Sequence, residues 1–305
     1  MMPWLAVRVP ASSANLGPGF DALGLALEIY LTCRFRRADA LSIRVEGRDA
    51  AQIPTSSDNL IWQTALTVAQ AHHIEMPPIE LEIQNDIPLG KGLGSSAAAL
   101  TAGVVIADHL LDLRWKPPRI LDEASRLEGH PDNVAPCTLG SIVASAIDSG
   151  GVTRSIRLEL PQRFGIGIVV PDFDLPTAIA RSVLPDSYSR ADAVFNVQRA
   201  SLLIAALATG STWAFPAALE DRFHQPYRAP LVPGLEEILR LRAPGLLGCV
   251  LSGAGPSILV FYERGHDSVC DLVRQIFRLN GHESQTLFAN IATRGFEFTE
   301  NAESW

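Results

Sequence analysis

The segment with the clearest chemistry is a glycine-rich loop that leads directly into a run of small residues. It reads PLGKGLGSSAA from Pro88 to Ala98, with three glycines at alternate positions. Glycine lets the backbone approach a ligand closely and point several N–H groups to one side. A helix that begins there adds unsatisfied donors and a partial positive charge. The loop therefore predicts a phosphate site, although a tight turn with close helix packing has the same composition.

Individual side chains of this loop carry further expectations. Lys91 can neutralise a phosphate oxygen, Ser95 and Ser96 can cap the helix, and one of the two hydroxyls can bind Mg²⁺. The loop has neither the Gly-Lys-Ser/Thr ending of a Walker A motif nor the Rossmann spacing. The residues expected at the nucleotide phosphates are Pro88, Leu89, Gly90, Lys91, Gly92, Leu93, Gly94, Ser95 and Ser96.

A second segment, Pro10–Asp21, places Asn15 and Asp21 among small and turn-forming residues. Asp21 has apolar neighbours, where a carboxylate is costly unless it meets a positive partner. We interpret this segment as a loop that grips an ammonium or hydroxyl group of a substrate. The alternative is an Asx turn that only stabilises the loop.

Two more polar or small-residue segments follow. Glu128–Asn133 reads EGHPDN, and its first carboxylate with a serine hydroxyl of the phosphate loop would suit Mg²⁺, which prefers oxygen ligands. We interpret His130 as a hydrogen-bond partner within this loop rather than a base. Leu251–Ser257 reads LSGAGPS, which is typical either of a hairpin turn or of a close approach between backbone and ligand.

Composition narrows the class of protein. The chain has 305 residues, 47% hydrophobic and 19% charged, with a net charge of -8, so a globular protein is expected. The acidic balance disfavours nucleic acid and anionic membranes as partners. The four cysteines are far apart and predict reduced structural thiols. The N-terminus has no signal-peptide pattern, and the cytoplasm is the expected compartment.

Apolar periodicity predicts strands alternating with helices, an α+β protein with mixed sheets whose two lobes meet near residue 160. The expected strands are 5–9, 29–35, 41–45, 79–83, 164–170, 246–251, 258–262 and 287–291. The expected helices are 60–72, 95–112, 122–128, 190–208, 235–241 and 267–279.

In order along the chain, these segments resemble the GHMP kinase superfamily and, within it, the homoserine kinase family. The three superfamily motifs correspond to Pro10–Gly24, Pro88–Ala99 and Ser252–Ile258. The stretches similar to homoserine kinases in particular are Glu128–Pro136 (EGHPDNVAP), Thr177–Pro185 (TAIARSVLP) and His224–Gly234.

The resemblance implies a two-domain fold. Residues 1–160 would form a domain like domain 2 of ribosomal protein S5, with the phosphate loop. Residues 161–305 would form a ferredoxin-like domain that completes the substrate site. The implied ligands are ATP, Mg²⁺ and L-homoserine, with O-phospho-L-homoserine as product in threonine biosynthesis. A homodimer is a further expectation from the family.

The resemblance also implies roles for residues. Asn15, Asp21, Asp132 and Asn133 would hold the amino and hydroxyl end of homoserine. Arg181 and Arg228 would bind its carboxylate, with Thr177 beside them. Ser96 and Glu128 would bind Mg²⁺, and Asn59 would lie near the adenine. The chemistry agrees, since a zwitterion needs a carboxylate near its ammonium and a guanidinium can bind two carboxylate oxygens at once.

The implied reaction is direct transfer of the γ-phosphoryl group of ATP, which depends mainly on positioning and charge stabilisation. Asp132, Asn133 and Lys91 are the candidate catalytic residues. Mg²⁺, Lys91 and the loop N–H groups would stabilise the developing charge. Whether Asp132 abstracts a proton or only orients the hydroxyl stays open.

Three other functions are compatible with parts of the pattern. A related kinase could act on mevalonate, an isoprenoid precursor or a sugar, but these substrates have no ammonium for Asp21 to bind. An S5-type domain also occurs in ribosomes, which raises nucleic-acid binding, but the chain has no basic run. A degenerate kinase acting as a regulator is disfavoured, because the phosphate loop, Glu128 and both arginines are present.

Overall fold

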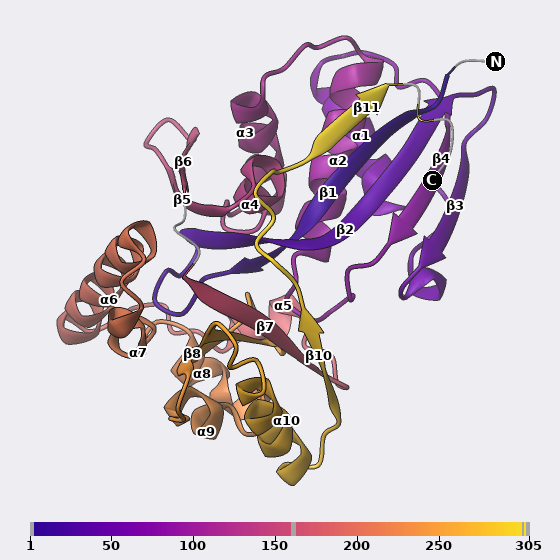
Figure 1. Cartoon of the computed structure of the whole chain (residues 1–305). Helices are drawn as coiled ribbons and strands as arrows, with labels where there is room; N and C mark the ends of the chain where they lie inside the picture. The colour runs from indigo at the N-terminus through magenta and orange to yellow at the C-terminus, as the bar shows by residue number, and fades with distance from the viewer. Residues whose placement is uncertain (1–2, 160–162, 301, 303–305) are drawn as a thin grey trace.

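Two β-sheets, each with its own helices, organise the chain in the computed structural model (Figure 1). The structure describes residues 3–159, 163–300 and 302. The α+β prediction is confirmed. The predicted boundary at residue 160 falls on residues 160–162, which lie outside the described residues, so the exact division of the domains stays a prediction.

The first sheet is mixed and has the path β11-β1-β2-β4-β3, with β5 paired to β2 and β6 to β5. All its described pairings are antiparallel except that of β3 with β4. Its strands are β1 (Leu5–Ala14), β2 (Leu23–Arg37), β3 (Ser42–Gly47), β4 (Ile79–Asn85), β5 (Ile142–Ile147), β6 (Thr153–Leu158) and β11 (Glu297–Glu300).

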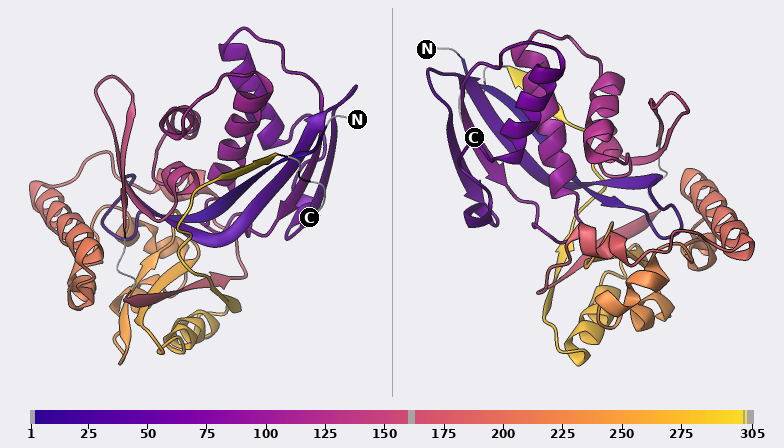
Figure 2. Two further views of the ribbon diagram at one scale, coloured as in Figure 1. Left: turned by 45° about the horizontal axis from the view of Figure 1, so that its top comes forward. Right: turned by 180° about the vertical axis from the view of Figure 1, so that it is seen from behind.

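Helices pack against one face of this sheet, as Figure 2 shows. Their bounds are α1 (Leu60–Ala71), α2 (Ser95–Leu110), α3 (Pro117–Glu128) and α4 (Val134–Leu139). The small residues of α2 let it lie deep in the core: a Cβ on Gly103 would come within 2.6 Å of the Ile61 carbonyl on α1. The predicted helix at 95–112 is confirmed as α2, and most of its residues are buried.

The second sheet is antiparallel, in the order β10-β7-β9-β8. Its strands are β7 (Phe164–Pro171), β8 (Leu246–Leu251), β9 (Ile258–Glu263) and β10 (Ser284–Phe288). The helices of this half are α5 (Thr177–Ser182), α6 (Arg190–Thr209), α7 (Phe215–Ala218), α8 (Gln225–Arg228), α9 (Leu235–Arg240) and α10 (Val269–Leu279). Short 3-10 helices complete the described elements: η1 (Ala50–Gln52) in the first half, and η2 (Thr212–Ala214) and η3 (Ala229–Leu231) in the second.

The end of the chain returns to the first sheet. After β10 the chain crosses back, Ile291 bridges Leu27 of β2, and β11 pairs with β1 (Figure 1). One continuous hydrophobic cluster also contains Leu16 from the first half with Phe215 and Phe261 from the second. The two halves therefore share a packed apolar junction.

Most predicted elements are confirmed with shifted ends. The sequence pattern missed the helices α4, α5, α7 and α8, the β5–β6 hairpin and β11. It placed the last-but-one strand at 287–291 rather than Ser284–Phe288. The segment Leu251–Ser257 joins two antiparallel strands, as a hairpin turn would. Cys33, Cys137, Cys249 and Cys270 are free and buried.

By length and composition, α6 is the one helix among the described residues that is long and apolar enough to cross a membrane. Only 22% of its most apolar window is buried. A single helix of this kind is weak support for a membrane span, because apolar helices of other proteins pass the same test.

Gly24 on β2 marks a contact that a side chain would break. An added Cβ would lie 1.8 Å from the Asp132 carbonyl oxygen and 2.8 Å from Pro136. We expect Gly24→Ala to lower the free energy of unfolding by about 2 kcal/mol or more, because a packed junction must shift. Urea unfolding measures this. Gly150→Ala is the control, since only the flexible Asp148 side chain lies near that position. Equal effects of the two changes would contradict the packing described here.

Candidate active site

Three segments that are far apart in sequence meet between the two sheets. The carbonyl of Gly253 accepts hydrogen bonds from Asn15 Nδ2 at 2.9 Å and from Arg228 Nη1 at 3.0 Å. The Gly253 N–H donates to the Ala14 carbonyl at 3.1 Å. The turn after β8 thus holds the Pro10–Asp21 loop in place.

The same turn holds the phosphate loop. Ser252 Oγ lies 2.7 Å from the Gly92 carbonyl oxygen and 2.8 Å from Ser13 Oγ. A Cβ on Gly92 would come within 2.2 Å of the Ser252 carbonyl oxygen. A Cβ on Gly94 would come within 1.9 Å of Ser12 Oγ. Both glycines have left-handed backbone, with φ of 72° and 69°. They are therefore required by contact between the motifs, whatever ligand the loop binds.

The start of α2 differs from the expected capping. Its N-cap is Gly94, and no side chain caps the helix, so the prediction that Ser95 and Ser96 cap it is wrong. The reason is that Gly94 itself takes the left-handed N-cap conformation. Ser96 is exposed, and its hydroxyl lies 3.5 Å from Glu128 Oε2. The first turn of α2 therefore keeps N–H donors for a ligand.

Lys91 points toward the second half of the chain. Its Nζ donates to the Phe173 carbonyl at 2.8 Å and pairs with Asp174 Oδ1 at 2.7 Å. The side chain thus ties the phosphate loop to the segment after β7. To reach a phosphate oxygen it would have to leave Asp174.

Two cavities meet at the phosphate loop and share Gly90, Ser95 and Ser96. One holds about 300 Å³ and is mainly apolar, with Leu31, Ile53, Ile61, Leu89 and Ala99 among its lining residues. Asn59 lies in its wall, where it caps α1 and donates to the Pro54 carbonyl. The second cavity holds about 160 Å³ and is lined by Glu128, His130, Asp132, Thr177, Arg181 and Arg228, among others.

We call this second cavity the charged cavity. Beside it, Asp21 and Arg181 form a bidentate ion pair. Arg181 Nη2 lies 2.7 Å from Asp21 Oδ1, and Nη1 lies 3.2 Å from Oδ2. Each side chain is about one-third exposed, at 34% for Asp21 and 36% for Arg181. The expected positive partner of Asp21 is therefore present. Arg181 and Thr177 lie on one helix, α5, and both line the cavity.

The side chain of Asn15 supports the loop. Its Oδ1 accepts the Asp21 N–H at 3.0 Å, and the side chain is almost fully buried. The structure favours the alternative interpretation here, in which Asn15 makes a turn that stabilises the loop. Asn15 thereby fixes where the Asp21 carboxylate lies.

The Glu128–Asn133 loop supplies further polar groups. His130 Nδ1 lies 2.5 Å from Oδ1 of the buried Asp132, and Asn133 Oδ1 accepts from Ser12 Oγ at 2.9 Å. Burial by itself would lower the pKa of His130, but the hydrogen bond and charge of Asp132 raise it above the ordinary value. Ligand atoms of Asp21, His130 and Asp132 lie within 4.8 Å of one another. The carboxylates of this group suit a small cation such as an ammonium.

Arg228 is the largest fully buried side chain of the described residues, at 1% exposure. Its Nε donates to the Ala180 carbonyl, and its Nη1 donates to Gly253 and to His224 Nδ1. Burial lowers the pKa of Arg228 to about 10, with Arg181 acting in the same direction, so the group stays charged at neutral pH. The ring centroid of Phe20 lies 5.7 Å from the guanidinium carbon of Arg181 and 5.7 Å from that of Arg228.

Sequence profiles and whole-chain comparisons place the protein in a family. Residues 59–141 match the GHMP kinases N terminal domain, and residues 203–271 match the GHMP kinases C terminal domain. A homoserine kinase of Solibacter usitatus is 78% identical over 296 residues, 97% of each chain. The chain belongs to the homoserine kinases of the GHMP kinase family.

Two further homoserine kinases agree with this assignment. One, of Deinococcus radiodurans, is 46% identical over 85% of this chain and 84% of its own length. The crystal structure of homoserine kinase from Cytophaga hutchinsonii aligns with a TM-score of 0.84 at 28% identity and 98% coverage of each chain. The two-domain GHMP kinase fold is confirmed, and membership in this kinase family implies ATP use with a metal ion.

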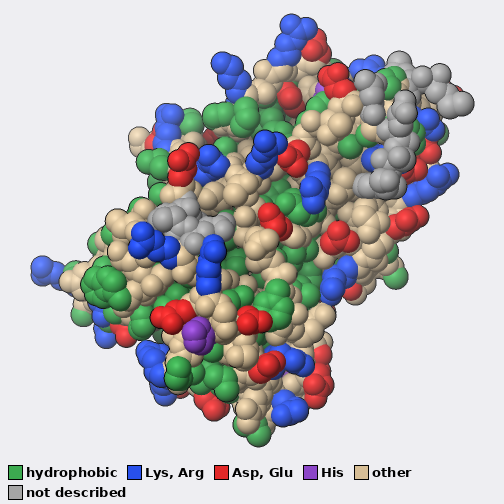
Figure 3. Space-filling model, viewed as in Figure 1, with side chains coloured by type: hydrophobic (Ala, Val, Ile, Leu, Met, Phe, Trp, Pro, Cys, Tyr) green, Lys and Arg blue, Asp and Glu red, His purple; other side chains and the backbone are tan. Residues whose placement is uncertain are grey.

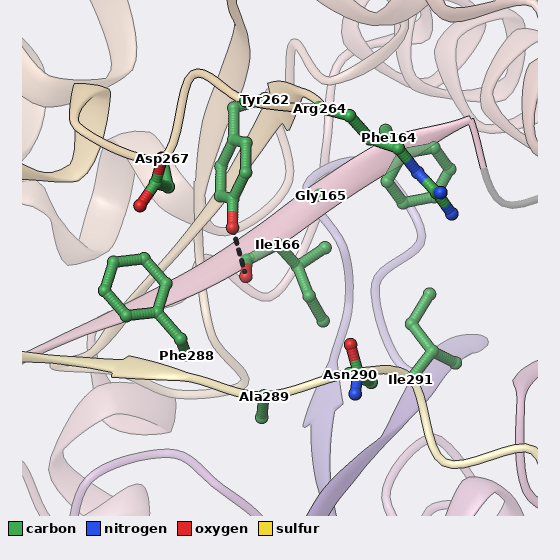
Figure 4. A pocket seen from close by; sticks show the side chains of 11 residues that line it. Phe164, Gly165, Ile166, Tyr262, Arg264, Asp267, Phe288, Ala289, Asn290 and Ile291 are labelled. Atoms are coloured by element: carbon green, nitrogen blue, oxygen red, sulfur yellow. Dashed lines mark hydrogen bonds between the residues drawn. The ribbon is translucent and has the colours of Figure 1, made fainter.

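In this homoserine kinase, the volume of a cavity does not by itself identify the candidate active site. A cavity of about 490 Å³, larger than either of the two at the phosphate loop, lies between β7, β9 and the segment after β10 (Figure 4). Tyr262 there donates to the Ile166 carbonyl at 3.2 Å. None of the predicted site residues lines this cavity.

Phe20 and His224 were missed as site residues. Phe20 directly precedes Asp21, and His224 precedes Arg228 by four residues. An apolar ring in a polar loop and a histidine one helical turn before an arginine were the available signals.

His224 predicts a pH dependence of stability. Burial lowers its pKa below the ordinary value; Asp221 opposes this shift and Arg228 adds to it. The unfolded chain therefore binds a proton at His224 that the folded chain excludes, so stability falls as pH drops below about 6.5. We expect His224→Asn to reduce this loss, by up to about 1.4 kcal/mol per pH unit. Urea unfolding of both proteins between about pH 5.5 and 7.5 measures it. Parallel curves for the two proteins would contradict a buried neutral His224.

Proposed function

We propose that this chain transfers the γ-phosphoryl group of ATP to the side-chain hydroxyl of L-homoserine, giving O-phospho-L-homoserine and ADP. The observation that carries the proposal is a cavity directly beside the phosphate loop that is lined by Asp132, Arg181 and Arg228. Its Arg181 is ion-paired with the Asp21 carboxylate. Such an arrangement suits a zwitterion that presents a hydroxyl to a nucleotide. The identity to homoserine kinases over nearly the whole chain supports the same substrate.

Asp21 and Arg181 would exchange their mutual ion pair for the two charges of the substrate. The ammonium would bind Asp21, with Asp132 nearby, and the carboxylate would lie between Arg181 and Arg228. Thr177 lies one helical turn from Arg181 and can donate its hydroxyl to the same carboxylate. Substrates without both charges would leave one partly buried group unpaired, which is costly.

The apolar cavity beside Asn59 would take the adenine, and the loop from Pro88 to Ser96 would take the phosphates. Ser96 and Glu128 fit Mg²⁺, because they present a hydroxyl and a carboxylate oxygen 3.5 Å apart beside the loop. When bound, Mg²⁺ would neutralise charge on the phosphate oxygens of ATP.

Asp132 would orient the substrate hydroxyl toward the phosphate. One oxygen of its carboxylate already lies 2.5 Å from His130 Nδ1, so a neighbouring side chain holds the carboxylate in place. Orientation is sufficient for phosphoryl transfer, which requires little covalent help from the protein. Asn133, tied to Ser12, would hold this loop against the phosphate loop.

The partner and compartment predictions extend this proposal. The net charge of -8 and the interspersed acidic and basic side chains on the face in Figure 3 support our expectation of no nucleic-acid partner. We propose a cytoplasmic enzyme that acts on small molecules without a membrane. A homodimer stays a family-based prediction.

The direct test is ADP release with Mg-ATP and a panel of L-homoserine, L-serine, L-threonine, mevalonate and galactose. We expect turnover selective for homoserine, with a kcat/KM at least about tenfold above any other member of the panel. Equal or higher turnover of mevalonate or galactose would keep the kinase fold and overturn the assigned roles of Asp21, Arg181 and Arg228.

The ion pair at the charged cavity gives a second test. We expect Arg181→Gln to raise the KM for homoserine roughly 10- to 100-fold, because a charge-assisted bidentate contact is lost. The KM for ATP should change by less than about twofold. Arg240→Gln is a matched control, since its ion pair with Glu236 is 80% and 68% exposed. An equal rise in the KM for homoserine in Arg240→Gln would contradict the assignment of Arg181 to the substrate carboxylate.

The proposed Mg²⁺ ligands, Ser96 and Glu128, give a third test. Glu128→Gln keeps the shape of the side chain but removes its charge, so we expect the Mg²⁺ concentration for half-maximal rate to rise about tenfold or more. Chelation of the metal with EDTA should abolish turnover of the unmodified enzyme. An unchanged Mg²⁺ dependence in Glu128→Gln would remove Glu128 from the metal site.

A further inference from the structure

His224 lies behind the charged cavity with both ring nitrogens engaged. The side chain has 0% exposure. Its Nε2 lies 2.8 Å from the Gly17 carbonyl oxygen, and its Nδ1 lies 2.9 Å from Arg228 Nη1. One face of the imidazole stacks on Phe20, with ring centroids 5.4 Å apart.

The partners determine which nitrogen of His224 carries the proton. A carbonyl oxygen can only accept, so Nε2 carries the hydrogen. A guanidinium can only donate, so Nδ1 presents its lone pair to Arg228. The imidazole is therefore neutral and acts as an acceptor for an arginine.

This contact restricts the guanidinium of Arg228. Nε donates to Ala180 and Nη1 to both Gly253 and His224. No described residue accepts a hydrogen bond from Nη2, and Arg228 lines the charged cavity. Rotation of the group would leave Nδ1 of His224 unpaired in a buried position, which is costly. Nη2 is thus the donor left for a ligand in the cavity.

Asp221 fixes the backbone at His224, and the His224 side chain contacts the loop that carries Asp21. The carboxylate of Asp221 accepts from the N–H groups of Phe223, His224 and Gln225, which fixes the turn that carries the imidazole. Gly17 lies between Asn15 and Asp21, in the loop whose Asp21 carboxylate pairs with Arg181. The imidazole of His224 is therefore hydrogen-bonded both to Arg228 and to the loop that carries Asp21.

We propose that His224 is a positioning residue, which as a neutral acceptor holds Arg228 toward the carboxylate of an amino-acid substrate. This inference rests on the proposed function, because it assumes that Arg228 binds the carboxylate. His224 does not touch the substrate. It affects which substrates bind because it fixes the orientation of the Arg228 guanidinium.

Two amide variants separate the bonds of the imidazole. The side-chain oxygen of His224→Asn can take the place of Nδ1 and accept from Arg228, but it loses the bond to Gly17. The amide of His224→Gln can take the place of Nε2 and donate to Gly17, but it loses the acceptor for Arg228. Purified full-length proteins with unchanged circular dichroism would be compared.

The readouts are the KM for homoserine and the inhibition constants of 4-hydroxybutyrate and 3-amino-1-propanol, which keep only the carboxylate or only the ammonium. We expect His224→Gln to weaken homoserine and 4-hydroxybutyrate roughly tenfold or more. Its inhibition by 3-amino-1-propanol should change by less than about twofold. His224→Asn should restore most of the affinity for the two carboxylate ligands. Equal losses for both inhibitors, equal losses in both variants, or no loss in His224→Gln would each overturn the proposal.

Arg228→Gln separates this inference from the proposed function. If that variant binds 4-hydroxybutyrate as well as the unmodified enzyme does, Arg228 does not bind the carboxylate and the proposed substrate assignment fails. If Arg228→Gln loses 4-hydroxybutyrate while His224→Gln retains it, the substrate assignment stands and only the role of His224 is overturned.

Discussion

The carbonyl group of Gly253 is the contact on which the site depends. Buried polar groups must find hydrogen-bond partners, and this oxygen satisfies both Asn15 from the first half of the chain and Arg228 from the second. Ser252 beside it contacts the phosphate loop at Gly92. The phosphate loop, the Asp21 loop and Arg228 are thus placed together by one turn. A small error in this turn would move all three.

Charge balance is the second constraint. Burial of Arg228 would be unfavourable if its donors were unsatisfied, and three protein acceptors surround it. Asp21 and Arg181, each about one-third exposed, balance each other in a direct ion pair beside the cavity. A zwitterionic substrate can replace this pair without leaving either charge alone. The same cavity borders the start of α2, so substrate selection and phosphate binding occur side by side.

The sequence was informative where local chemistry decides the structure. The alternating pattern of β4, the small residues of α2 and the glycine loop are local signals, and each predicted its element. The four-residue spacing of Thr177 and Arg181 is close to one helical turn, and both lie on α5. The family resemblance brought together residues that are over one hundred positions apart, which periodicity cannot do.

The missed features depend on contacts between distant segments. The short β11 has no strong pattern, and its pairing with β1 is seen only when the chain is folded. The partner of Lys91, Asp174, comes from the other half of the chain. The absence of a serine cap on α2 follows from the left-handed Gly94, which is pressed against Ser12. The neutral state of His224 follows from two partners that lie 207 and 4 positions away.

The most direct test of this account is a crystal structure with L-homoserine and a non-hydrolysable ATP analogue. The account predicts the ammonium at Asp21, the carboxylate between Arg181 and Arg228, and the phosphates at the start of α2. The ion pair between Asp21 and Arg181 should have opened. Homoserine bound elsewhere, with that ion pair intact, would contradict it.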